Sequence, residues 1–510
     1  MTNRTNLLKY RTRSLYNQPG YQLGSTYRKE YLMCGIIGVI QGRSQLVNPL
    51  ELVGRSFRDL EHRGQHGAGI AVTGNDFWME KGVGRATVVF DPERPEYQRL
   101  AKVPKPRMAV GHARYATQGK PSTENMQPHV MDSFCGEVCC LSNGDLPDYC
   151  PLRQQMEAAG AVFKSRNDAE YILRRVFQLS GGQPRKMVDA VKQLMLELRG
   201  AYSAIIMTKD IMIVFRDPWG IRPLVHGVLG DSPIFASETC TIKGLGADVV
   251  GTVRPGEIVI ATPAGIQDRF QVVRAERRSH CILETIYLHR PDSKFEGVEA
   301  GAFRYRCGKK LNEEHPVPEA EFVSSVPRSG DMAAIGYAAQ ARQDFRITLI
   351  HKPSVGRQFI GEPESKDPRE KFSAMEGAFE HRKRGVWVDD SVIKGGTWAR
   401  LAKMIREAGA KEVHLRVASP PNCNPCRTGI HTPDRDKLWV NRFIEGDKPP
   451  DLIRGAKDLH LDSLEYLSIE GLKSAFQNPD NGEWESDPDQ WCTHCLDGRP
   501  IFSEIEPVTS

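Results

Sequence analysis

Residues 34–275 combine short apolar runs with glycine turns and helix-like stretches. The apolar runs include CGIIGVI (34–40) and AYSAIIMT (201–208), and the helix-like stretches are DAEYILRRVFQL (168–179) and KMVDAVKQLMLELRG (186–200). Short apolar runs bounded by glycine are typical of β-strands, whereas apolar residues three and four positions apart indicate amphipathic helices. We therefore predict antiparallel sheets covered by helices over this part of the chain.

The pattern changes between about residue 295 and residue 440, where apolar strands lead into amphipathic helices. FVSSVP (322–327) precedes DMAAIGYAAQAR (331–342), and GVWVDD (385–390) leads through a glycine-bearing loop to TWARLAKMIREAGA (397–410) and a further strand-like run. Strand, loop, helix and strand in this order are typical of parallel βαβ units. We therefore predict a parallel sheet here.

The chain is 510 residues long, which is enough for two or three domains with separate cores. We predict four segments: an N-terminal extension or propeptide (1–33), an α+β domain of antiparallel sheets (34–275), an α/β domain with a parallel sheet (276–440) and a polar helical and loop-rich tail (441–510).

The formal net charge of +5 is concentrated in the first 33 residues, which hold six Lys or Arg against the single acid Glu30. The rest of the chain is therefore near neutral, and we expect no nucleic-acid partner. No apolar run approaches the roughly 20 residues that a membrane-spanning helix needs, so we expect no membrane partner either.

Twelve cysteines in 510 residues are too few for a disulfide-stapled secreted scaffold. The first thirty residues also lack the continuous apolar core of a signal peptide. We therefore expect reduced thiols and a cytoplasmic location. The basic, acid-poor extension, which carries Ser14 and Ser25, leaves an organellar location open.

Cys34 directly follows Met33 and opens the first apolar run. A cysteine nucleophile needs a base, and the free α-amino group of an N-terminal residue is one such base. That chemistry requires Cys34 to be the first residue of the mature protein, either because translation starts at Met33 or because residues 1–33 are removed. A lone cysteine in this position could instead be a buried residue of a first strand.

Three motifs follow Cys34 in order, LEHRGQHGAGI (60–70), GHARYATQG (111–119) and LSNGDL (141–146). Together with the cysteine they resemble the N-terminal-nucleophile glutaminase domain of class II glutamine amidotransferases, which is an αββα sandwich. The resemblance implies a catalytic nucleophile, two oxyanion-hole donors, a ligand for the glutamine carboxylate and a ligand for its ammonium group. These roles fall respectively on Cys34, Asn143 and Gly144, Arg114, and Asp168.

A second informative stretch is VWVDDSVIKGGT (386–397), in which a strand ends at two aspartates before a small-residue loop opens a helix. Backbone amides at such a loop and helix N-terminus bind phosphate, and carboxylates hold ribose hydroxyls and Mg²⁺. The stretch resembles the phosphoribosylpyrophosphate (PRPP) motif of type I phosphoribosyltransferases. The resemblance implies PRPP-binding roles for Arg328, Asp389, Asp390, Ser391, Lys394, Gly395, Gly396 and Thr397, with Ser329, Asp389 and Asp390 at Mg²⁺.

A class II glutaminase followed by a phosphoribosyltransferase motif resembles one family, the amidophosphoribosyltransferases. FRDPWGIRPL (215–224), RPGEIV (254–259) and ETIYLHRPDS (284–293) are also similar to segments of that family. The resemblance implies that glutamine is hydrolysed through a Cys34 thioester and that the ammonia crosses an internal channel to displace pyrophosphate from PRPP. The product is 5-phosphoribosylamine, the first intermediate of de novo purine synthesis. It also implies a homodimer or homotetramer inhibited by purine nucleotides.

Two alternatives remain open at this point. The chain could be a related glutamine amidotransferase that aminates another phosphorylated sugar or nucleotide. It could also be a non-catalytic iron–sulfur homologue with a regulatory role.

The C-terminal stretch WCTHCLDG (491–498) contains a C-x-x-C pair, which could be a metal site, a redox pair or neither, and we favour a metal site. Some amidophosphoribosyltransferases carry a [4Fe–4S] cluster on four cysteines, and the resemblance implies such a cluster here. Zinc on the same thiolates is the alternative, and Cys423 is the rival for the third ligand. The implied ligands are Cys281, Cys426, Cys492 and Cys495.

The segment that resembles a phosphoribosyltransferase (276–440) departs from the family pattern at three places. VPRSG (326–330) has Arg328 where the family has an acid, and KGGT (394–397) has Lys394 and Gly396 where the family has R-G-T-T. The family's K-N-R-Y-x-G-R-T-F-I loop reads HKPSVGRQFI (351–360). The changed loop positions are Pro353, Ser354 and Gln358.

Overall fold

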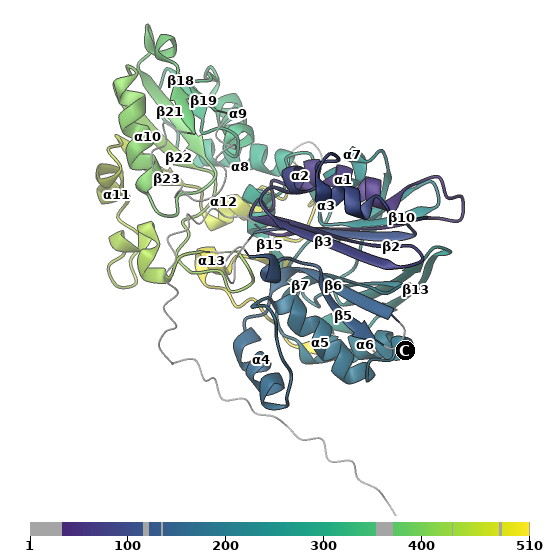
Figure 1. The fold of residues 1–510 in the computed structure, drawn as a ribbon. Helices are drawn as coiled ribbons and strands as arrows, with labels where there is room; N and C mark the ends of the chain where they lie inside the picture. The colour runs from purple at the N-terminus through teal and green to yellow at the C-terminus, as the bar shows by residue number, and fades with distance from the viewer. Residues whose placement is uncertain are drawn as a thin grey trace, which may run out of the picture.

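The computed structural model describes residues 33–115, 122–133, 136–352, 371–430, 432–478 and 482–508. They form two lobes, with antiparallel sheets in the first and a parallel sheet in the second (Figure 1). No helix in these ranges is long and apolar enough to cross a lipid bilayer.

The first lobe contains two antiparallel sheets packed face to face. The strands of the seven-stranded sheet, in spatial order, are β11 (Asp248–Thr252), β9 (Val225–Leu229), β10 (Ser232–Ala236), β1 (Gly35–Ile40), β4 (Met108–Arg114), β2 (Gly67–Thr73) and β3 (Phe77–Val83). Those of the six-stranded sheet are β13 (Gly265–Gln271), β12 (Glu257–Thr262), β8 (Met212–Arg216), β7 (Ala201–Met207), β6 (Gly136–Asp145) and β5 (His129–Ser133).

Helices cover the outer face of each sheet. Helix α1 (Pro49–Leu60) packs on the seven-stranded sheet, and α5 (Asp168–Ser180) and α6 (Met187–Glu197) pack on the six-stranded sheet (Figure 1). The two helix-like stretches of the sequence thus form helices within a few residues of their expected bounds. The αββα sandwich predicted for this region is confirmed.

Strand β1 is apolar at nearly every position because both of its faces are buried. Ile36 and Ile40 pack between the two sheets, whereas Ile37 and Val39 pack against α1. Gly38 faces the second sheet, where an added Cβ would lie 2.8 Å from the sulfur of Met212. A side chain there would force the sheets apart.

The second lobe is built on a four-stranded parallel sheet in the order β18 (Phe322–Ser325), β21 (Arg384–Asp389), β22 (Glu412–Val417) and β23 (Ser463–Tyr466). Helices α8 (Ala300–Glu314), α9 (Asp331–Ala341) and α10 (Gly396–Glu407) accompany it. The predicted parallel α/β sheet is confirmed. Its fourth strand lies beyond residue 440, in the segment expected to be tail.

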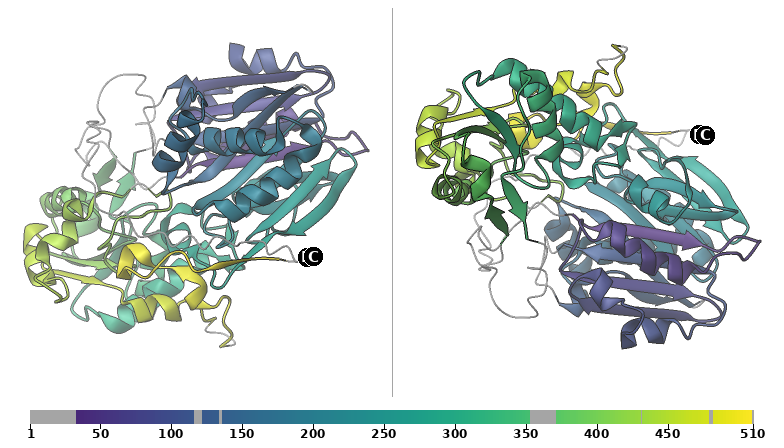
Figure 2. Two further views of the ribbon diagram at one scale, coloured as in Figure 1. Left: turned by 90° about the horizontal axis from the view of Figure 1, so that it is seen from below. Right: turned by 90° about the horizontal axis from the view of Figure 1, so that it is seen from above.

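The C-terminal segment returns from the second lobe to the first (Figure 2). Strand β24 (Trp491–Cys492) pairs in parallel with β15 (His280–Cys281), and β25 (Ile505–Pro507) pairs with β14 (Val273–Ala275). One hydrophobic cluster contains residues of both lobes and of this segment, including Trp219, Phe303 and Trp491. The tail therefore ties the lobes together.

Candidate active sites

Cys34 lies directly before β1 and is only 8% exposed. Its thiol lies 3.7 Å from the carbonyl oxygen of Tyr115. Burial raises the pKa of the thiol, and the nearby cations Arg114 and Arg63 partly oppose this rise. Met33 is itself buried, so the main chain before the cysteine is enclosed, while residues 1–32 lie outside the described part of the chain.

Arg114 and Asp168 have opposite electrostatic effects on this thiol: Arg114 lowers its pKa, and Asp168 raises it. Arg114 ends β4, Asp168 begins α5, and both are buried. Burial and the neighbouring Asp145 raise the pKa of Asp168 to about 7, although Arg114 lowers it. The structure thus brings together the cation and the carboxylate that an amino acid's own charged groups require.

Asn143 and Gly144 lie in β6, opposite Ser203 and Tyr202 of β7. The side-chain amide of Asn143 is fully buried, and neither its oxygen nor its nitrogen has a hydrogen-bond partner among the described residues. Buried polar groups are rarely left unpaired except where a ligand completes them. An added Cβ at Gly144 would lie 1.9 Å from the carbonyl oxygen of Ala201, so only glycine fits there.

We name the five residues Cys34, Arg114, Asn143, Gly144 and Asp168 the nucleophile site. All five were predicted from the sequence motifs, and the structure places them at the ends of β4 and β6 and at the starts of β1 and α5.

The sequence motifs gave no role to Arg63, which contacts the main chain of the proposed nucleophile, Cys34. Its Nε donates to the carbonyl oxygen of Cys34 at 3.1 Å, and its Nη atoms bond Glu238 at 2.6 Å and Glu284 at 2.9 Å. Glu284 also accepts from Arg222 at 3.1 Å. We name these four fully buried side chains, Arg63, Glu238, Glu284 and Arg222, the buried ion network.

The network keeps its charges despite complete burial. Burial by itself would raise the pKa of Glu284, but Arg63, His289 and Arg222 hold it far below its usual value. Buried charges are stable only when they are paired in this way. Arg63 stands within the HRGQ motif, but nothing in its spacing indicates partners more than 170 residues away.

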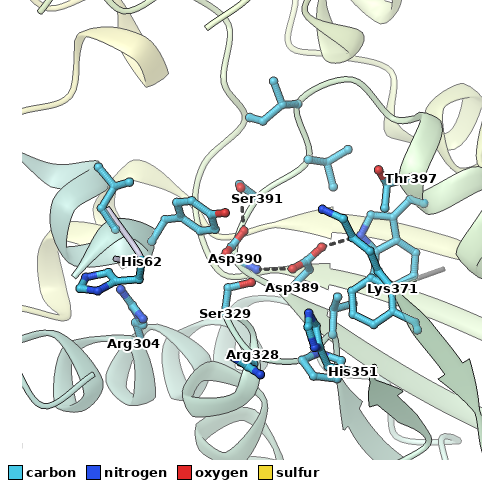
Figure 3. A pocket seen from close by; sticks show the side chains of 18 of the residues that line it. His62, Arg304, Arg328, Ser329, His351, Lys371, Asp389, Asp390, Ser391 and Thr397 are labelled. Carbon is cyan, nitrogen blue, oxygen red and sulfur yellow. Dashed lines mark hydrogen bonds between the residues drawn. The ribbon is translucent and has the colours of Figure 1, made fainter. Parts of the chain in front are cut away.

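A cavity of about 640 Å³ opens where strands β18 and β21 end (Figure 3). It contains all the predicted PRPP-binding residues except Gly396, together with Ser329. We name it the acceptor cavity. Among the described residues its acids are Asp389 and Asp390, and apart from Tyr287 its other titratable lining groups are cationic or imidazole groups. They are Arg58, His62, His289, Arg290, Arg304, Arg328, His351, Lys371 and Lys394.

The loop before α10 shows why one glycine is required and the next is not. Gly395 has φ of +71°, and an added Cβ would lie 2.3 Å from the ring of Trp439. Gly396 begins α10, and an added Cβ would meet only the guanidinium of Arg400, at 3.8 Å. Gly396, Lys394 and Thr397 are exposed, so this helix N-terminus faces solvent.

Several cavity residues were not predicted. His62 comes from the first lobe, and Arg304 reaches the cavity from α8. His289 and Arg290 stand in the family-like segment 284–293, so their signal was present but carried no role. Pro353, Ser354 and Gln358 of the divergent loop lie outside the described residues.

The four predicted cluster cysteines share one region. Cys281, Cys492 and Cys495 are buried in the same hydrophobic cluster, and Cys426 packs against it. The pKa of Cys495 is raised by burial and then by Cys426, Cys492 and Cys281. Cys423 packs in a different cluster, with the parallel sheet. Within the described ranges, no three His, Cys, Asp or Glu are placed to hold a single metal ion.

Comparisons with known proteins point to one family. The profile of a family described as "Glutamine amidotransferase domain" matches residues 112–244. The chain is 37% identical over 448 residues to the amidophosphoribosyltransferase of Archaeoglobus fulgidus, covering 87% of this chain and 93% of that protein. It is 36% identical over 487 residues to the chloroplastic amidophosphoribosyltransferase of Vigna aconitifolia, covering 94% of this chain and 93% of that protein.

The fold agrees as well. The solved structure of glutamine PRPP amidotransferase from Bacillus subtilis, complexed with ADP and GMP, superposes with a TM-score of 0.79 at 35% identity. The match covers 92% of this chain and 98% of that one. Since these relatives are 36–37% identical and cover 87–94% of the chain, and since the sandwich and the parallel sheet match the solved structure, the chain belongs to the amidophosphoribosyltransferase family.

Proposed function

We propose how the chain performs the amidophosphoribosyltransferase reaction, the first step of purine biosynthesis. The Cys34 sulfur attacks the carboxamide carbon of glutamine, and the freed α-amino group of the same residue carries the proton to the leaving ammonia. Water then hydrolyses the thioester to glutamate. Arg114 holds the substrate carboxylate, and Asp168 holds its ammonium group.

Asn143 and Gly144 are the proposed donors to the oxyanion of the tetrahedral intermediate. The side-chain amide of Asn143 is buried and has no partner among the described residues, which suits a donor whose acceptor forms only during the reaction. A pre-set donor needs no reorganisation when the charge appears.

The acceptor cavity is the proposed site for PRPP. Its cations suit the phosphate and pyrophosphate groups of this ligand, and the loop from Ser391 to Thr397 suits its 5′-phosphate. Ammonia attacks C1 of the ribose, and the bond from C1 to the pyrophosphate oxygen breaks. Arg328 lines the same cavity, so we assign it to a pyrophosphate oxygen in place of the family's acid.

The observation that best supports this proposal is that two consecutive residues, His62 and Arg63, reach the two sites. His62 lines the acceptor cavity, whereas the next residue donates to the carbonyl of Cys34. Both side chains bond the same carboxylate, Glu238, at 2.8 Å and 2.6 Å. A path of hydrogen-bonded side chains therefore leads from the main chain of Cys34 to the wall of the acceptor cavity, which supports transfer of ammonia between the two sites.

Mg²⁺ fits this cavity. The ion usually takes only one or two carboxylates and completes its shell with water and substrate phosphates. Asp389 and Asp390 are the acids that the described residues offer, with Ser329 beside them (Figure 3). When bound, Mg²⁺ would neutralise part of the pyrophosphate charge.

A [4Fe–4S] cluster fits the four cysteines better than zinc does. A cluster is larger than one ion, so its thiolates stand further apart, and no single-ion arrangement exists among the described residues. Its role would be structural, because these thiols join the tail to both lobes. Iron and sulfide content after anaerobic purification tests this: Cys426→Ser should lose both, whereas Cys423→Ser should keep both.

Regulation and assembly follow the family in this proposal. Purine nucleotides are the proposed inhibitors, since the Bacillus subtilis structure was complexed with ADP and GMP. We propose a homodimer or homotetramer in the cytoplasm. Import into an organelle is the alternative that the basic segment 1–33 supports.

The deciding experiment uses protein that begins at Cys34 and is purified without air. Glutamine and Mg²⁺ are added with and without PRPP, and glutamate and pyrophosphate are followed together. Matched release of both only with PRPP supports the proposal. Glutamate without pyrophosphate would mean that the acceptor is another phosphorylated compound.

A further inference from the structure

The two adjacent carboxylates at the end of β21, Asp389 and Asp390, differ in their hydrogen bonds to the rest of the protein. In Asp389, Oδ1 accepts the main-chain N–H of Asp390 at 2.9 Å, and Oδ2 accepts the indole N–H of Trp398 at 2.7 Å. In Asp390, Oδ1 accepts the hydroxyl of Ser391 at 2.6 Å. The other oxygen, Oδ2, is buried and has no hydrogen-bond partner in the described part of the chain.

Trp398 is well placed to hold Asp389. It is the third residue of α10, it is 2% exposed, and its ring packs in the hydrophobic cluster of the parallel sheet. An indole nitrogen can only donate, and a bond from it to a carboxylate is short and strong. Rotation of Asp389 toward a ligand would break this bond and leave the buried indole N–H unpaired.

Asp390 has the opposite surroundings. A buried carboxylate oxygen without a donor is costly unless a ligand completes it. The hydroxyl of Ser329 and the guanidinium of Arg304 face Asp390, and Arg304 is itself held by the carbonyls of Thr285 and His289. Asp390 therefore keeps one carboxylate oxygen, Oδ2, without a partner among the described residues.

We propose that Trp398 is a positioning residue that holds Asp389 as an internal anchor and leaves Asp390 as the carboxylate that meets the acceptor. The ligand of Asp390 Oδ2 is a ribose hydroxyl of PRPP or the Mg²⁺ that accompanies it. The inference rests on the proposed function of the acceptor cavity, and it divides roles that the sequence motif assigned equally to both acids.

Calorimetric titration with PRPP and Mg²⁺ tests the division without requiring turnover. Trp398→Phe removes the indole N–H and should weaken binding about tenfold, as expected for the loss of a hydrogen bond to a charged group. Trp387→Phe is the matched control, because the fully buried indole of Trp387 donates to Thr348 at 3.0 Å and does not line the cavity. This control should bind like the unmodified protein.

The aspartate variants complete the test. Asp390→Asn should weaken binding by about 100-fold or more. The losses of Asp389→Ala and Trp398→Phe should not multiply, because each variant removes the bond between the two side chains. Thermal melting of each variant shows whether it is folded, and the Asp390→Asn measurement does not depend on the tryptophan variants.

The results separate the inference from the proposed function. If the unmodified protein releases pyrophosphate but Asp389→Asn weakens binding as much as Asp390→Asn, or Trp398→Phe behaves like Trp387→Phe, the inference alone is wrong. If the unmodified protein does not bind PRPP, both are wrong. The predicted pattern of binding, with or without turnover, supports the division of roles.

Discussion

The nucleophile site is enclosed and uses one cation and one carboxylate, whereas the acceptor cavity is open and is lined by many cations. The substrates proposed for the two sites account for this difference. Glutamine carries one charge of each sign, so a matched pair of side chains suffices for it. PRPP is a polyanion, and an open cationic cavity both attracts it and offers many phosphate contacts.

The two regions also differ in how they are built. The nucleophile site is assembled on strands of two packed sheets within one lobe, which gives it little freedom to move. The acceptor cavity is lined by loops at the ends of parallel strands and by residues of the first lobe. Such loops adapt more readily, and this is where the sequence departs from its family.

The largest effect is expected for Cys34→Ala, which should abolish the activity of the nucleophile site and leave that of the acceptor cavity. Glutamine-dependent turnover should fall by at least about 10⁴-fold, because the nucleophile is lost. Pyrophosphate release driven by added ammonium salt should remain near that of the unmodified protein. Uncleaved protein that retains residues 1–33, verified by mass, should show the same selective loss, and full glutaminase activity in it would contradict the N-terminal mechanism.

Asn143→Ala should lower kcat for glutamine hydrolysis by about 10² to 10³-fold, as removal of an oxyanion donor does. The ammonia-dependent reaction serves as the internal control and should be unchanged. A change in the KM for glutamine with kcat preserved would show instead that Asn143 binds the ground state.

Arg63→Gln should destabilise the protein by about 3 kcal/mol, because it leaves Glu238 and Glu284 buried with fewer counter-charges. Urea unfolding followed by circular dichroism measures this. Arg454→Gln is the control, since its pair with Glu445 is exposed and should contribute nothing measurable. Equal effects of the two variants would mean that the buried ion network is not a source of stability.

The pH dependence of glutamine binding distinguishes the two regions more finely. Burial and Asp145 raise the pKa of Asp168 to about 7, so its carboxylate becomes protonated as the pH falls below that value. The KM for glutamine should then rise about tenfold per pH unit, while the KM for PRPP should not follow it. Asp145→Asn should lower the pKa of Asp168 and move the rise to lower pH. An unshifted profile would assign the titration to another group.

The smallest effect concerns the loop before α10. Gly396→Thr has room for its side chain and should tighten PRPP binding by about two- to fivefold through one added hydroxyl. Gly395→Ala is the contrasting variant and should weaken binding, because the left-handed φ and the ring of Trp439 exclude a Cβ. Weaker PRPP binding by Gly396→Thr would show that the open position serves closure of the loop instead.

The sequence determined the elements and the chemistry that depend on local order. Strand β1 was evident because its apolar run is continuous, and α5 and α10 were evident from their helical periodicity. The motifs predicted roles for Cys34 and Asp389, and the structure places the first directly before β1 and the second at the end of β21.

Only the tertiary structure decided which distant groups meet. It placed Arg63 under Cys34 and against Glu284, 221 residues away, and it brought Cys426 rather than Cys423 beside the other cluster cysteines. It also revealed that Trp398 bonds Asp389. The physical reason is that periodicity and spacing report on neighbouring residues, whereas ion pairs and thiol clusters depend on how whole lobes pack.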